Sequence, residues 1–71
     1  MTAKGELMRQ INLLSSGTIA GIIGSSKYSV IDRAAYKTLL LVSSMTEDEC
    51  AAVRTLEDIA ALFHQAQEAN C

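Results

Sequence analysis

The sequence predicts a small all-α domain, and three observations support that prediction. Its 71 residues contain no proline, 49% of them are apolar and only 4% are aromatic. A proline-free chain rich in Ala and Leu favours helices over a turn-rich β fold. Apolar residues also recur at helical spacing along most of the chain. We therefore expect one domain over residues 1–71, with three to four helices built on an antiparallel helical hairpin.

The first half of the chain predicts one regular helix and one short helix. Leu7, Ile11 and Leu14 follow the i, i+4, i+7 spacing of one helical face, which predicts a helix at about 3–15. A Ser-Ser-Gly sequence then interrupts the pattern, and the apolar piece after it predicts a brief helix at 18–24. We expect the N-terminal helix to pack across the hairpin.

The second half predicts the two helices of that hairpin. Ser29 is expected as the N-cap of a helix at about 30–44. Thr46 and Glu49 have the spacing of a capping box, which predicts the start of a helix over 47–69. An apolar seam along this second helix alternates steps of three and four residues, as in helical bundles: Val53, Leu56, Ala60 and Phe63.

Four consecutive apolar residues, Leu39 to Val42, predict a homodimeric bundle. Successive helical residues turn by about 100°, so these four point all around the axis and need cover on every side. A chain this short covers them poorly, and a two-fold partner would complete the cover. The alternative is cover by the piece at 19–23 within the monomer. The residues expected at an interface with a second copy or another protein are Leu39, Leu40, Val42, Leu56 and Phe63.

Charge divides the chain into two unlike parts. Residues 1–45 carry a net charge of +3 and residues 46–71 carry −5, for the total of −2. Three interpretations stay open: the two halves attract each other on packing, the acidic helix docks on a basic partner, or the charges form a solvated face.

The residues that carry chemistry are few and badly spaced for it. His64 is the only histidine, and Cys50 lies fourteen residues upstream, about 21 Å along one helix. Two thiols and one imidazole match no metal-binding pattern, and no glycine-rich phosphate loop follows a strand. We therefore expect no enzyme, no metal site, no cofactor and no small-molecule substrate.

Location is predicted from the thiols and from hydropathy. With only Cys50 and Cys71, the chain cannot form the several bridges of a secreted mini-protein, so both thiols are expected to be reduced. The longest apolar run has four residues, far below the ~20 that span a bilayer, and no signal peptide opens the chain. A cytoplasmic protein without membrane contact is expected.

Residues 18–30 resemble a helix-turn-helix unit. Ala20 and Gly24 match the small residue of the first helix and the glycine that opens the turn, while Ser25 stands where that family has an apolar residue. The resemblance implies that Ile23 and Val30 are core residues. It also implies contacts to DNA bases and phosphates from Ser26, Lys27, Tyr28, Arg33 and Lys37.

The preferred interpretation is a small non-enzymatic regulatory or adaptor protein that acts by protein–protein interaction as a homodimer. Tyr28 and Tyr36 are further candidate contacts, since tyrosine is enriched at interfaces. Other candidates are leftover apolar area around Met8, Ile19 and Ile22, and an acidic face with Glu57 and Asp58. The alternative is a helix-turn-helix-type DNA-binding transcriptional regulator that uses residues 18–37.

Overall fold

The all-α prediction is confirmed. The computed structural model describes residues 2–69 and contains no strand within them. It has five helices, connected by short turns: α1 (Ala3–Leu13), α2 (Ser16–Ile23), α3 (Tyr28–Ser44), α4 (Glu47–Ala51) and α5 (Leu56–Ala69).

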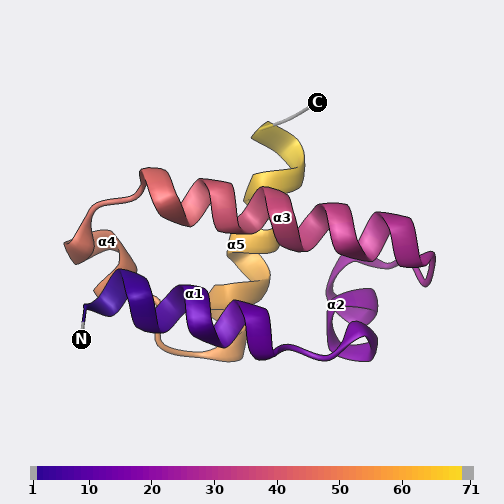
Figure 1. The fold of residues 1–71 in the computed structure, drawn as a ribbon, viewed down its shortest axis with the longest axis horizontal. Helices are drawn as coiled ribbons and strands as arrows, with labels where there is room; N and C mark the ends of the chain where they lie inside the picture. The colour runs from indigo at the N-terminus through magenta and orange to yellow at the C-terminus, as the bar shows by residue number, and fades with distance from the viewer. Residues whose placement is uncertain (1, 70–71) are drawn as a thin grey trace.

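The helices form a slab of 32 × 24 × 17 Å (Figure 1). The helices α1 and α3 lie along its long axis at the front, with α2 closing one end and α4 the other. The last helix, α5, packs against α3 from behind and crosses it instead of running alongside it. The antiparallel hairpin expected from the sequence is therefore not confirmed.

One core lies where the helices meet, and every helix contributes to it. Its most enclosed large side chains are Phe63, Ile11 and Val42. The one buried polar side chain among the described residues, Thr38, donates its Oγ1 hydroxyl to the carbonyl of Ala34 at 2.8 Å. That hydrogen bond satisfies the hydroxyl, so its burial leaves no unpaired polar group.

Polar side chains cap the starts of α1, α2 and α4. Thr2 and Ser15 accept the N3 backbone N–H groups of α1 and α2. The capping box predicted at Thr46 and Glu49 is confirmed, with both of its reciprocal hydrogen bonds present. The predicted cap at Ser29 is wrong, because α3 already begins at Tyr28 and has no side-chain cap.

A clasp of two charged residues fixes the start of α1 against the α3–α4 connection. The Glu47 carboxylate accepts the backbone N–H groups of Ala3 and Lys4, the second at 3.1 Å. The Lys4 ammonium in turn donates to the carbonyl of Ser43 at 3.1 Å. A carboxylate near the positive N-terminal end of a helix dipole and an ammonium near the negative C-terminal end both stabilise the helix.

The single helix predicted over 47–69 is wrong, because the chain starts a second helix inside it. The Asp58 carboxylate accepts the N–H groups of Arg54 and Thr55 at 3.1 Å each, and Asp58 donates its own N–H to Thr55 Oγ1 at 3.2 Å. The N–H of Arg54, followed by the groups of Thr55, lowers the pKa of Asp58 below its ordinary value. This second cap starts α5 at Leu56, after α4 has ended at Ala51, and α5 runs in a new direction.

Candidate protein-binding face on α3

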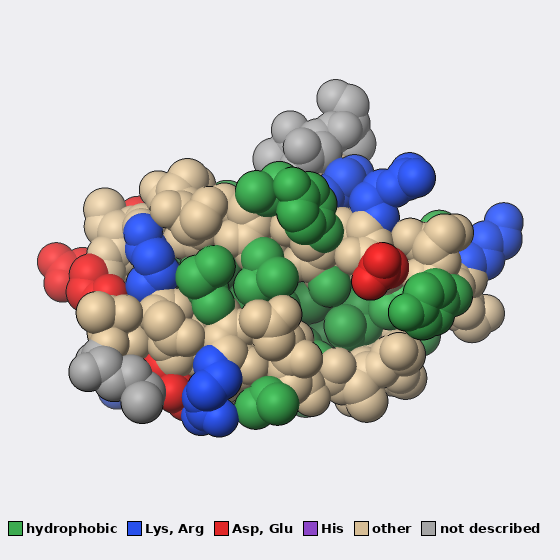
Figure 2. Space-filling model, in the orientation of Figure 1, with side chains coloured by type: hydrophobic (Ala, Val, Ile, Leu, Met, Phe, Trp, Pro, Cys, Tyr) green, Lys and Arg blue, Asp and Glu red, His purple; other side chains and the backbone are tan. Residues whose placement is uncertain are grey.

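The side of α3 that points away from the core carries large apolar side chains. Tyr28, Tyr36 and Leu40 are 75%, 62% and 49% exposed. Because a helix has 3.6 residues per turn, residues spaced by four or eight lie on neighbouring lines of one surface. Together with Asp32 and Arg33, these three residues are called the outer face of α3 below. Figure 2 shows apolar side chains gathered on this side of the molecule.

A groove borders the outer face on the side of α1 and α2. It has two adjoining parts of ≈ 550 Å³ and ≈ 200 Å³, which share Asn12, Asp32 and Ala35 as lining residues. Tyr36 and Leu39 line the larger part, and the smaller part reaches the core. The lining of the smaller part is Ile11, Asn12, Leu14, Ser16, Ile19, Tyr28, Ile31, Asp32 and Ala35.

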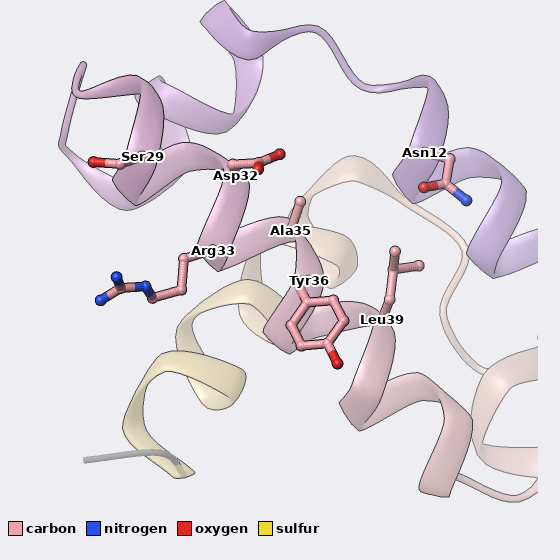
Figure 3. A pocket seen from close by; sticks show the side chains of 7 residues that line it. All are labelled: Asn12, Ser29, Asp32, Arg33, Ala35, Tyr36 and Leu39. Carbon is pink, nitrogen blue, oxygen red and sulfur yellow. The ribbon is translucent and has the colours of Figure 1, made fainter.

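The charged side chains of the outer face point in different directions. Figure 3 shows Asp32 directed toward the side where Asn12 of α1 lies, whereas Arg33 and Ser29 are directed away from it. Within residues 2–69 the ion pair present is Arg9–Glu6 on α1, so Asp32 has no cationic partner there. The acidic residues of α4 lie at the opposite end of the molecule (Figure 2).

The structure separates the five residues expected at an interface. Val42 and Phe63 are fully enclosed in the core and cannot belong to a surface of the folded chain. Leu40 lies on the outer face of α3, and Leu39 is half-buried beside the groove. Leu56 is exposed at the start of α5 and does not join them. The apolar seam predicted from Val53 to Phe63 is not continuous, because Val53 lies outside any helix.

The run from Leu39 to Val42 is also covered unevenly. Val42 is buried, Leu39 and Leu41 are half-buried and pack against the core, and Leu40 is left exposed. The monomer thus covers most of this run, and Ile19 and Ile23 of α2 contribute to the same core. Less apolar surface is therefore left exposed on this run than its four consecutive apolar residues predict.

The resemblance to a helix-turn-helix unit has partial structural counterparts. Gly24 ends α2 with φ +72°, the left-handed region that glycine adopts without strain, and a short turn leads to α3. Ser26, Lys27, Tyr28 and Arg33 are exposed, and Lys37 is half-buried. Ile23 packs against the core as the resemblance implies, but Val30 is exposed, so its expected core position is wrong.

The residues considered for chemistry do not come together. Cys50 is buried in the core, and burial raises the pKa of its thiol. His64 is exposed on α5. Among residues 2–69 no three His, Cys, Asp or Glu side chains are grouped as metal ligands, and Cys71 lies outside the described residues. The absence of an enzymatic activity remains a prediction.

Sequence reasoning singled out Tyr28 and Tyr36 but missed the groove and the place of Asp32 in it. The signal was present, because Tyr28, Asp32 and Tyr36 recur every four residues and so share one side of a helix. The contribution of Asn12 had no such signal, since it depends on how α1 docks beside α3.

None of the helices within residues 2–69 combines the length and the apolar character that a membrane crossing requires. No family model, no curated protein and no solved structure matches this chain.

Proposed function

We propose that this chain is a small non-enzymatic regulatory or adaptor protein that binds protein through the outer face of α3. The observation that supports the proposal is the exposure of three large side chains, Tyr28, Tyr36 and Leu40, on one helix. Tyrosine side chains supply large contact area at a low entropic cost, and they are enriched at interfaces. A cytoplasmic location belongs to the same proposal.

The proposal includes a homodimer in which two copies cover Leu40 and Tyr36 of each other. An exposed apolar patch on a helix can form a two-fold interface, in which the patch of one subunit contacts the same patch of the other. Because Leu40 is half-exposed in the monomer, a charge introduced there weakens association without unfolding the chain.

Sedimentation equilibrium under reducing conditions tests this part, with Leu40→Asp as the variant and Leu13→Asp as its matched control. Both leucines lie in the C-terminal part of a helix, and Leu13 is 69% exposed but outside the outer face. We expect the parent and Leu13→Asp to dimerise, and Leu40→Asp to be a folded monomer. A monomeric parent at millimolar concentration, or equal association of both variants, contradicts the homodimer.

A second candidate function is DNA binding through α2, the turn and α3. It is favoured by the glycine-terminated α2 and by the exposed Lys27 and Arg33 at the start of α3. An amide NMR titration with random-sequence duplex at low salt tests it. Salt-reversible shifts confined to residues 26–37, and lost in Lys27→Glu, would favour DNA binding over protein binding. An unchanged spectrum would exclude it.

A further inference from the structure

Three side chains follow one another at four-residue steps along the groove side of α3: Tyr28, Asp32 and Tyr36. Each step advances about 6 Å along the axis and turns by about 40°, so the carboxylate lies between two aromatic side chains. Tyr28 lines the smaller part of the groove, Tyr36 the larger part, and Asp32 both. The three residues therefore form one continuous wall.

The negative charge of Asp32 in this wall is not paired with a cation of the described residues. Asp32 is the only acidic residue of α3, and it has no hydrogen bond or ion pair from its side chain within residues 2–69. Its side chain is directed toward α1, whereas the adjacent Arg33 is directed away (Figure 3). An exposed carboxylate that forms no ion pair within the described residues is free to attract a cation from outside the chain.

The rest of the groove suits the stem of a long basic side chain. Beside the polar side chains of Asn12 and Ser16, its smaller part is lined by aliphatic side chains: Ile11 of α1, Leu14 directly after α1, Ile19 of α2, and Ile31 and Ala35 of α3. Lysine and arginine bury their methylene stems on apolar surface while the charged group reaches a polar partner. Tyrosine faces also attract an ammonium or guanidinium group. The groove thus offers a carboxylate, two aromatic side chains and several aliphatic ones in one place.

We propose that the groove binds an arginine or lysine side chain of a partner protein segment, with its cationic group at Asp32 between Tyr28 and Tyr36. The inference rests on the proposed function, because it assigns the partner's chemistry to the face that the proposed function uses. The basic side chain sits next to an aliphatic one in the partner segment, and that aliphatic side chain occupies the larger part of the groove beside Ala35 and Leu39.

The test is an amide NMR titration at low salt with two capped pentapeptides. One is acetyl-Leu-Ala-Arg-Leu-Ala-amide, and the other has citrulline in place of arginine, which keeps the shape and removes the charge. We expect shifts at Tyr28, Asp32 and Tyr36, with binding of the citrulline peptide weaker by about tenfold, since it loses both the ion pair and the cation–π contact.

Three variants test where in the groove the cationic group of the peptide binds. Asp32→Asn weakens the arginine peptide by about fivefold and leaves the citrulline peptide unchanged. Tyr28→Leu weakens the arginine peptide by about threefold. Asp48→Asn, which removes an exposed carboxylate on α4 outside the groove, leaves both peptides unchanged.

Equal affinity of the two peptides, absence of binding at millimolar concentration, shifts confined to α4, or an unchanged affinity in Asp32→Asn would each overturn the inference. These outcomes are distinguishable from failure of the proposed function. The proposed homodimer fails when Leu40→Asp leaves association unchanged. The peptide titration is run with that same variant, which keeps every residue that lines the groove and is expected to leave Tyr36 uncovered.

Discussion

Replacement of Phe63 by alanine discriminates between the core described above and the surface seam expected from the sequence. Phe63 is fully enclosed, and phenylalanine-to-alanine changes in such sites cost about 3–5 kcal/mol of unfolding free energy. At about 0.05–0.15 kcal/mol per residue, a chain of 71 residues has about 4–11 kcal/mol in total. We therefore expect Phe63→Ala to lose about a quarter or more of the unfolding free energy, up to complete unfolding.

Urea unfolding followed by circular dichroism provides the measurement, with Leu56→Ala as the control. Leu56 belongs to the same sequence seam but is 55% exposed, so its truncation should cost less than about 1 kcal/mol. Phe63→Leu keeps most of the volume and gives a measurable midpoint if Phe63→Ala does not fold. Equal urea midpoints for Phe63→Ala and Leu56→Ala would refute the reasoning.

Three further predictions concern the turn, a cap and a thiol. Gly24→Ala should destabilise the protein by about 1–2 kcal/mol because the φ of Gly24 is +72°. Gly21→Ala should stabilise it by about 0.5–1 kcal/mol, because Gly21 lies inside α2 with open space around the added methyl group. Chemical denaturation measures both changes, and two changes of the same sign would contradict the turn assigned at Gly24. Because the native pKa of Asp58 is lowered, the unfolded chain binds more protons, so stability should fall as pH drops from about 5 through that native pKa. In Asp58→Asn, the midpoint of urea unfolding should depend less on pH than in the parent. An equal dependence on pH in both proteins would contradict the role of Asp58 as the cap of α5. Iodoacetamide should alkylate Cys50 only through unfolding, so that its rate, followed by peptide mapping, rises with urea; equal rates in native and unfolded protein would show that the thiol is accessible.

Local signals in the sequence were sufficient for the helix content and for one helix start. The capping box at Thr46 and Glu49 is encoded within four residues, and the structure has it as predicted. Thr55 and Asp58 repeat the same spacing nine residues later, so the break between α4 and α5 was also encoded locally. The continuous apolar spacing through 53–63 concealed it, because periodicity alone does not distinguish one helix from two.

The arrangement of the helices was not available from such local signals. Whether Phe63 belongs to a surface seam or to the core depends on α5 crossing α3, which follows from the turn at 52–55. The groove depends in addition on where α1 docks, so the sequence could place Tyr28, Asp32 and Tyr36 on one side of a helix without indicating what lies opposite.

The clasp at the start of α1 has a consequence for the order in which the chain folds. Beside the Thr2 cap, the carboxylate that accepts the first two N–H groups of α1 belongs to Glu47, more than forty residues downstream. A nascent chain that ends before Glu47 has only the local Thr2 cap at the amino end of α1, and closing so long a loop costs entropy that only later contacts repay. We therefore expect α1 to dock late during synthesis, after α3 is complete, even though it is the first helix to be made.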